Sequence, residues 1–276
     1  MRVVRRIITI ASIIASISGA AAEPAIEKGD KKLPLPGEAF RLNGKDAFVI
    51  LPEKTEGKIP WVWYAPTLPG LPAKSEEWMF RQVLEAGVAV AGIDVGESYG
   101  SPSGREVYGE FYDHLVGRRG FSAKPCLLAR SRGGLMLYSW AVDNSGKVAG
   151  VAGIYPVCNV ASYPGVAKAA PAFGFTAEEL TAKLAEHNPI DRLKPLAEVG
   201  VPIRHIHGDK DKVVPIDKNS ALLEKRYRAF GGPVEIEVVK GGGHDMWEGW
   251  FKSQALVDFI ITEAKRAEES PPDEKS

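Results

Sequence analysis

The sequence has few cysteines and no excess of charge of either sign. Two cysteines stand among 276 residues, and 35 basic residues balance 35 acidic ones. A disulfide-rich scaffold is therefore excluded, and no overall field favours nucleic acid or an anionic membrane surface. Hydrophobic residues make up 45% of the chain and charged residues 25%, a composition that can bury the core of one globular domain.

The two cysteines are predicted to be buried free thiols. Cys126 lies early in one apolar run, and Cys158 lies beyond the far end of the next run. If these runs are adjacent parallel strands, the sulfur atoms lie on the order of 15 Å apart at ~3.3 Å per residue, which is too far for a disulfide.

Long apolar runs are also missing. The N-terminal run, residues 7–17, is shorter than the roughly 20 residues that a membrane anchor needs. Arginines precede this run and Ala20, Ala21 and Ala22 follow it, a pattern typical of a secretory signal peptide. We therefore predict a signal peptide over residues 1–22, with the mature protein periplasmic or secreted and free of the membrane.

After a proline-rich leader at residues 23–45, short apolar runs alternate with helical patterns. Strands are expected over residues 46–52, 60–66, 88–94, 125–131, 148–156, 201–208 and 234–243. Helices are expected over residues 75–86, 104–117, 133–144, 217–231 and 252–267. This alternation predicts an α/β fold with a doubly wound, mostly parallel sheet.

The alternation is interrupted once, at residues 157–188. No strand pattern occurs there, and Thr176 with Glu179 forms a capping box that begins a helix. An insertion at this point lies over the carboxyl ends of the strands, where open α/β sheets bind ligands, so we interpret it as a short lid. One domain is predicted over residues 46–268, followed by a disordered tail at 269–276.

Ser131 stands between an expected strand and an expected helix in the stretch LLARSRGG. A nucleophilic serine on such a sharp turn needs small residues two positions before and after it, and Ala129 and Gly133 occupy those positions. A serine in this place can instead simply cap the following helix. The stretch alone does not decide between the two.

A serine nucleophile also needs a base and an acid. Of the five histidines, His244 follows the last expected strand through three glycines, whereas His114, His187, His205 and His207 stand where structural imidazoles are expected. Asp211 follows the preceding strand and is predicted to orient His244, while Asp209 is expected to brace the turn.

The same stretch, Asp209 to Val213, also resembles the phosphoryl-accepting motif of haloacid-dehalogenase-like phosphatases, which binds Mg²⁺. That motif belongs near the N-terminus and needs acidic residues downstream, whereas here a glycine loop with a histidine follows. We therefore expect no metal and no organic cofactor.

Ser131, Asp211 and His244 follow successive strands in the order nucleophile, acid and base, and with this order the chain resembles the α/β-hydrolase fold family from about residue 47 to 267. The resemblance implies an oxyanion hole made by the backbone N–H groups of Arg132 and Thr67. Pro66 stands where many members have glycine and carries no N–H, so the Thr67 assignment depends on the register of this loop.

Several side chains are expected at the same sheet edge. The aromatic candidates for substrate binding are Tyr99, Tyr155, Trp247 and Trp250, whose flat faces suit sugar or aryl groups or else serve packing. Arg130 and Arg132 either bind an anionic group of the substrate or pair with Asp94 and Glu97.

The sequence thus predicts an exported serine hydrolase that cleaves carboxylic esters, carried on a carbohydrate or another environmental substrate, through an acyl-enzyme. A prolyl-oligopeptidase-like peptidase is the alternative enzyme, although that group usually carries a large gating domain for which this chain has no room. A degenerate hydrolase that acts as a binding protein is the alternative of another class. The oligomeric state is not predicted.

Overall fold

The computed structural model describes residues 24–269 of the chain. The predicted signal peptide at residues 1–22 lies outside the described residues, as does the predicted tail apart from Glu269. No helix within residues 24–269 has the length and apolar character needed to cross a membrane.

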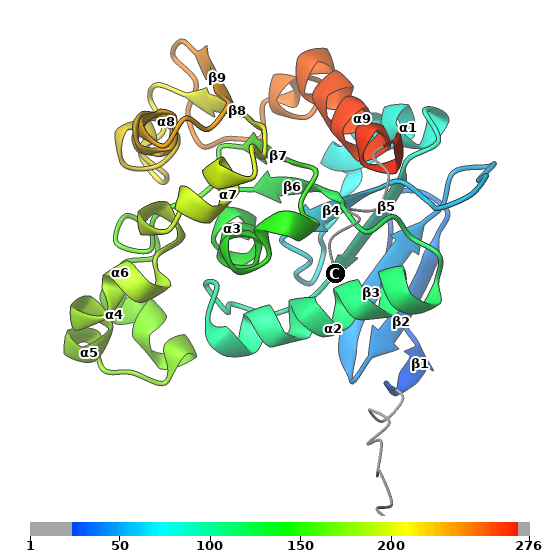
Figure 1. Ribbon diagram of the computed structural model, residues 1–276, viewed down its shortest axis with the longest axis horizontal. Helices are drawn as coiled ribbons and strands as arrows, with labels where there is room; N and C mark the ends of the chain where they lie inside the picture. The colour runs from blue at the N-terminus through cyan, green and yellow to red at the C-terminus, as the bar shows by residue number, and fades with distance from the viewer. Residues whose placement is uncertain (1–23, 270–276) are drawn as a thin grey trace, which may run out of the picture.

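Nine strands within residues 24–269 form one sheet at the centre of the molecule (Figure 1), in the order β1-β2-β3-β5-β4-β6-β7-β8-β9. They are β1 (Ile26–Lys28), β2 (Glu38–Leu42), β3 (Lys45–Ile50), β4 (Trp61–Ala65), β5 (Ala89–Ile93), β6 (Cys126–Arg130), β7 (Gly150–Ile154), β8 (Ile203–Gly208) and β9 (Val234–Val239). The strands from β5 to β9 in this order are parallel, and β1, β2 and β3 are antiparallel. The predicted α/β class, the mostly parallel sheet and all seven expected strands are confirmed.

The segment expected to be only a leader contributes two strands to the sheet. β2 pairs with β3 through a tight hairpin in which Leu42 faces Lys45. Asn43 and Gly44 form its turn with φ values of 50° and 75°, as a two-residue hairpin turn requires. The dipeptide Asn-Gly is the local signal that identifies this hairpin in the sequence.

Helices cover both faces of the sheet (Figure 1). One face carries α1 (Glu77–Glu85) and α9 (Gln254–Glu269), and the other carries α2 (Pro102–Arg118), α3 (Gly133–Asp143), α7 (Lys194–Glu198) and α8 (Ser220–Ala229). Alternate strand residues feed two cores: Trp61 and Trp63 face α2 and α3, whereas Val62 and Tyr64 face α1. Each of the five expected helices is present.

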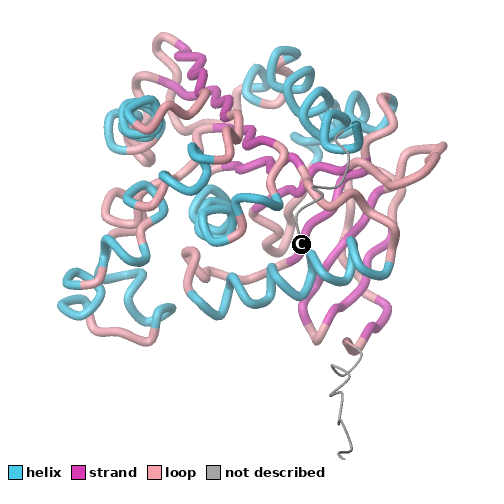
Figure 2. The backbone as a smooth tube through the Cα atoms, in the orientation of Figure 1, coloured by secondary structure: helices cyan, strands magenta, loops and turns pink. Residues whose placement is uncertain are grey.

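Residues 157–188 fold into short helices joined by loops, at one end of the molecule (Figure 2). They are α4 (Val166–Ala169), α5 (Ala177–Ala182) and α6 (Leu184–His187). Thr176 caps α5, and Glu179 bonds back to the Thr176 N–H, so the capping box is confirmed. Val160 and Leu180 of this insertion pack with Tyr99 and Leu135 into a small cluster of their own.

Single turns of 3-10 helix complete the fold. They are η1 (Lys74–Glu76), η2 (Ser145–Lys147), η3 (Ala170–Phe173), η4 (Pro189–Asp191), η5 (Ile216–Lys218) and η6 (Glu248–Trp250). Cys126 and Cys158 are buried and unbridged, as predicted. Burial raises the pKa of both thiols well above the usual value, so neither ionises at neutral pH.

Candidate functional site

The turn from β6 into α3 holds Ser131 in a left-handed backbone conformation, with φ of 48°. Its carbonyl oxygen accepts hydrogen bonds from Gly134 N–H at 3.0 Å and Val157 N–H at 2.8 Å, and its own N–H donates to Ile154 O at 3.0 Å. A residue other than glycine rarely adopts this conformation unless the surrounding structure fixes it. Three backbone hydrogen bonds therefore hold Ser131 at the tip of a sharp turn.

Two glycines allow neighbouring segments of the backbone to pack closely around this turn. A Cβ atom on Gly133 would stand 2.2 Å from Ala65 O, and one on Gly134 would stand 2.3 Å from Val157 O. Both obstructing atoms belong to the backbone, so neither can turn aside. Gly133, the small residue expected two positions after Ser131, is therefore required by its direct contact with the end of β4.

The structure brings Ser131, His244 and Asp211 together from three separate loops. Ser131 Oγ lies 2.9 Å from His244 Nε2, and His244 Nδ1 lies 2.7 Å from Asp211 Oδ2. Because a carboxylate only accepts, the imidazole carries its proton on Nδ1, which leaves Nε2 free to accept from the Ser131 hydroxyl. The side chain of His244 is 17% exposed and that of Asp211 is fully buried.

The Asp211 carboxylate is held at both oxygens. Oδ1 accepts the N–H groups of Val213 at 2.9 Å and Val214 at 2.7 Å, and Oδ2 faces His244. Burial favours the protonated carboxyl, but hydrogen bonds from His207, His244 and the Val214 N–H outweigh it and hold the pKa of Asp211 well below its usual range. The carboxylate is therefore charged at neutral pH.

Asp209 occupies a bracing position, as expected. Its Oδ1 accepts the Gly241 N–H at 2.6 Å and ties the loop after β8 to the loop after β9. Among residues 24–269, no three His, Cys, Asp or Glu side chains gather as metal ligands would. Asp209 therefore bonds to the loop after β9, whereas Asp211 Oδ1 accepts N–H groups of its own loop.

The two amides expected to form an oxyanion hole lie in loops that touch. Ala65 and Pro66 pack directly against Gly133 in the turn after Ser131. Within residues 24–269, the backbone N–H groups of Thr67 and Arg132 donate to no protein acceptor. Thr67 is buried, and its hydroxyl donates to Tyr64 O at 3.2 Å. The assignment of both amides to an oxyanion hole stays a prediction.

Both arginines beside Ser131 are paired with acids. Arg132 forms an ion pair with Glu97, as one of the two sequence interpretations expected. Arg130 pairs with Glu76 at the end of η1, and the expectation that it pairs with Asp94 is wrong. Asp94 instead accepts the Gly96 N–H at 2.7 Å, so the loop after β5 uses it internally.

Three of the four aromatic candidates are buried. Tyr99 packs beneath the insertion, Tyr155 lies against His244 with ring centroids 4.3 Å apart, and Trp250 donates its indole N–H to Asp245 at 2.8 Å. Each is at most 6% exposed, which favours the packing interpretation over contact with a substrate. Trp247 is 52% exposed and keeps an accessible ring.

No protein-family model and no curated protein matches this sequence. Solved structures match it at low identity. An S-formylglutathione hydrolase from Agrobacterium tumefaciens superposes with a TM-score of 0.61 and 17% identity, over 81% of this chain and 90% of that one. Est1E from Butyrivibrio proteoclasticus superposes with a TM-score of 0.58 and 15% identity, over 85% of this chain and 99% of that one.

A third matching structure has a much longer chain than this protein. The Pyrococcus horikoshii acylaminoacyl peptidase superposes with a TM-score of 0.64 and 16% identity, over 92% of this chain and 43% of that one. The chain has the α/β-hydrolase fold. Within this fold, Ser131 stands at the turn after β6, Asp211 follows β8, and His244 follows β9.

Two histidines regarded as structural in the sequence lie close to the site in this α/β-hydrolase fold. His205 and His207 are fully buried on one face of β8, and His207 Nε2 lies 3.4 Å from Asp211 Oδ2. Their spacing of two along a strand places both rings on the same face of the sheet. This spacing was the one sign in the sequence that the two histidines lie together. No pattern in the sequence indicated that Glu76 pairs with Arg130.

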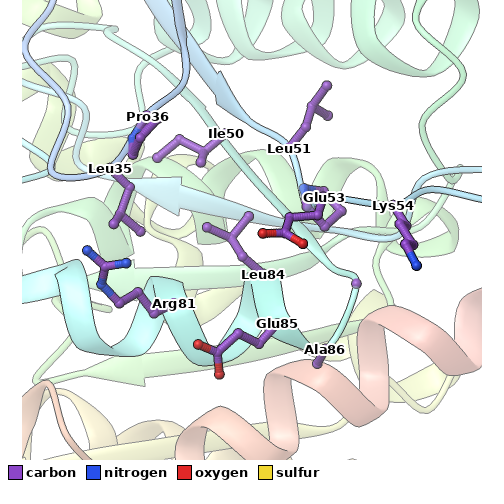
Figure 3. A pocket seen from close by; sticks show the side chains of 12 residues that line it. Leu35, Pro36, Ile50, Leu51, Glu53, Lys54, Arg81, Leu84, Glu85 and Ala86 are labelled. Atoms are coloured by element: carbon purple, nitrogen blue, oxygen red, sulfur yellow. The ribbon is translucent and has the colours of Figure 1, made fainter.

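A pocket of about 760 Å³ lies away from these residues (Figure 3). It is lined by Leu84 and Arg81 of α1 and by Ile50 and Glu53 at the end of β3. Because β3 runs antiparallel to β5, this pocket opens at the amino ends of the parallel strands. It therefore lies at the opposite edge of the α/β-hydrolase sheet from Ser131.

Proposed function

We propose that the protein is a serine hydrolase that cleaves carboxylic esters. The proposal rests on one observation: Ser131, on a turn with φ of 48°, lies 2.9 Å from an imidazole that in turn lies 2.7 Å from a buried carboxylate. This arrangement gives a hydroxyl its base and gives the base a fixed orientation, which is what nucleophilic catalysis by serine requires.

In the proposed reaction, His244 Nε2 takes the Ser131 proton as Oγ attacks the ester carbonyl. The N–H groups of Arg132 and Thr67 stabilise the resulting oxyanion, each contributing about 3 kcal/mol. His244 then gives the proton to the leaving alcohol, and an acyl group remains on Ser131. A water molecule, deprotonated by the same imidazole, releases the acid and restores the hydroxyl.

The share of each neighbour that this chain covers supports an ester as the substrate. The chain spans 90% of the S-formylglutathione hydrolase and 99% of Est1E, but 43% of the acylaminoacyl peptidase. A peptidase of the acylaminoacyl type remains the second candidate, because that structure covers 92% of this chain with a TM-score of 0.64. A degenerate hydrolase that only binds its ligand is the alternative of another class.

Apolar side chains on the acid and base loops indicate what the ester carries. Val213, Met246 and Trp247 are 48%, 58% and 52% exposed, two or three residues from Asp211 or His244. The Trp247 ring is fixed, since it lies over Gly249 and meets Trp250 edge-on at 5.2 Å. A fixed, exposed indole suits a pyranose or aryl ring, so an ester on a carbohydrate or other environmental polymer is proposed.

Export is part of the proposal. It rests on the arginines, the short apolar run and the small residues at Ala20, Ala21 and Ala22 near the N-terminus. N-terminal sequencing of the protein recovered from outside the cytoplasm is expected to begin at Glu23. Recovery of the chain with Met1 only in the cytoplasm would contradict export without affecting the proposed reaction.

The reaction is tested with purified protein and a panel of aryl acetates, feruloyl esters, uronoyl esters and longer acyl esters. The protein is expected to release acid and to react with a fluorophosphonate, and Ser131→Ala is expected to abolish both, by at least about 1,000-fold in turnover. Ser145→Ala, at a serine whose side chain makes no hydrogen bond within the described residues, is the control and keeps full activity.

The alternatives give different results in the same experiment. A peptidase would cleave peptidyl anilides faster than aryl esters of the same acyl group, and a binding protein would not react with the fluorophosphonate at all. Equal hydrolysis by the wild type and Ser131→Ala would overturn the proposed function.

A further inference from the structure

A chain of buried hydrogen bonds leads from α3 to Asp211. Tyr138 Oη lies 2.7 Å from His205 Nε2, and His205 Nδ1 lies 2.9 Å from Ser220 Oγ. Ser220 Oγ lies 2.8 Å from His207 Nδ1, and His207 Nε2 lies 2.8 Å from Val214 O and 3.4 Å from Asp211 Oδ2. All four side chains in this chain are fully buried, so no water competes with these bonds.

The acceptors at the Asp211 end of this series of hydrogen bonds determine which group donates in each of them. Val214 O and Asp211 Oδ2 can only accept, so His207 Nε2 must carry a proton. The neutral imidazole then has a bare Nδ1, which accepts the Ser220 hydroxyl proton. The opposite direction would place a bare His207 Nε2 against a carbonyl and a carboxylate, which is repulsive.

The same reasoning continues to Tyr138. Ser220 has one proton and gives it to His207, so it accepts from His205, whose proton is therefore on Nδ1. His205 Nε2 then accepts the Tyr138 hydroxyl proton. Burial lowers the pKa of His205 to about 3, which keeps this ring neutral. The two histidines are therefore opposite tautomers.

We propose that His207 is a positioning residue for Asp211, kept as the Nε2–H tautomer by the Tyr138–His205–Ser220 chain. Asp211 Oδ1 is fixed by two backbone N–H groups, whereas Oδ2, the atom that faces His244, has His207 as its other neighbouring donor. The His207 N–H bonds to Val214 O at 2.8 Å and lies 3.4 Å from Oδ2, so it holds the loop around Asp211, limits rotation of the carboxylate and thereby fixes the His244 ring toward Ser131. This inference rests on the proposed function for its effect on the reaction.

The tautomers are tested on the wild-type protein by ¹⁵N–¹H correlation spectra of the imidazoles at neutral pH. The expected spectrum shows one buried histidine protonated on Nδ1 only and one on Nε2 only, assigned to His205 and His207 with single variants. Two identical tautomers, or a doubly protonated His207, would overturn the proposed proton direction. This measurement needs no substrate and no turnover.

The positioning role is tested with His207→Leu, which removes the donor, and His207→Gln, whose amide N–H reaches the place of Nε2. The readout is the rate of fluorophosphonate labelling of Ser131. We expect labelling to slow about 10- to 100-fold in His207→Leu and to recover to within about threefold in His207→Gln. His114→Leu, which removes a buried imidazole of α2 that is remote from the chain, is the control and labels at the wild-type rate.

The outcomes separate the inference from the proposed function. Wild-type labelling in His207→Leu, or equal slowing in His207→Gln, would overturn the positioning role. If His207→Leu does not fold, the comparison of His207→Gln with the wild type and the tautomer spectra decide. A wild type that does not label would instead overturn the proposed function, and the tautomer spectra would still test the proton direction.

Discussion

Arg130 carries a charge into the interior one residue before Ser131. Its guanidinium pairs with Glu76, lies 4.9 Å from the centre of the Phe251 ring, and contacts Met246 Sδ at 3.2 Å. Glu76 is 1% exposed and also accepts from Tyr64 Oη at 3.0 Å. The pair therefore joins η1 to the base of the turn that carries Ser131.

Arg130→Met is expected to destabilise the protein by about 3–5 kcal/mol, because it leaves the Glu76 carboxylate buried beside neutral donors only. The measurement is urea unfolding at pH 7. The double variant Arg130→Met/Glu76→Gln removes both charges and is expected to recover most of the loss. A single variant within about 1 kcal/mol of the wild type would show that the pair does not contribute to stability.

At the scale of single residues, the sequence predicted the members of the Ser131 site but not their supports. Ser131, Asp211 and His244 each follow an apolar strand, and the carboxyl ends of parallel strands share one edge, so local patterns suffice to bring them together. Glu76 lies 54 residues before Arg130 in a single helical turn. The contact between His207 and Asp211 depends on the conformation of the loop after β8. Contacts of this kind depend on tertiary packing, which no local pattern encodes.

At the scale of elements, the junction of β6 and α3 depends on two backbone contacts. Gly133→Ala is expected to destabilise the protein by about 3 kcal/mol or more and to suppress fluorophosphonate labelling, because its Cβ would stand 2.2 Å from Ala65 O. Unfolding by urea and the labelling rate measure the two effects.

The control is Gly109→Ala in the interior of α2, where an added Cβ meets nothing within 4 Å. That variant is expected to gain up to about 1 kcal/mol, because alanine favours a helix over glycine. If Gly133→Ala behaved like Gly109→Ala, the contact of the turn with the loop after β4 would not constrain Ser131.

The elements themselves were largely predictable. All seven expected strands and five expected helices are present, since each carries a clear apolar period. β1 and β2 were missed because β1 is exposed throughout and β2 buries only Phe40 and Leu42. Their place in the sheet comes from pairing with β3, and the Asn43-Gly44 turn was the one local sign of it.

At the scale of the whole molecule, buried histidines make the free energy of unfolding depend on pH. Burial is the largest cause that lowers the pKa values of His114, His187 and His205, the last to about 3. The unfolded chain takes up protons near pH 6.5, where these rings stay neutral in the folded state. The stabilisation is therefore complete above about pH 6.5 and is lost as the pH falls from there toward 3.

We expect His205 to make the free energy of unfolding fall between pH 6.5 and 4 by up to about 1.4 kcal/mol per pH unit, with smaller losses from His114 and His187 in the same direction. Asp211, whose pKa is lowered, adds a further loss only below about pH 4. Urea unfolding at pH 7, 6, 5 and 4 measures the slope of the free energy of unfolding against pH. His205→Gln is expected to reduce the number of protons taken up on unfolding by one, and the slope falls accordingly. A free energy that is constant from pH 7 to 5 would contradict this account.

The separation of Ser131 from His244 along the chain has a consequence for folding. Their hydrogen bond joins residues 113 positions apart, and β7, β8 and β9 lie between them in the sequence. A contact of such long range forms late, since the intervening strands must first find their places in the sheet. A chain that is still emerging from the ribosome, or only partly folded, therefore carries an ordinary serine, and its reactivity appears only when the last loop arrives.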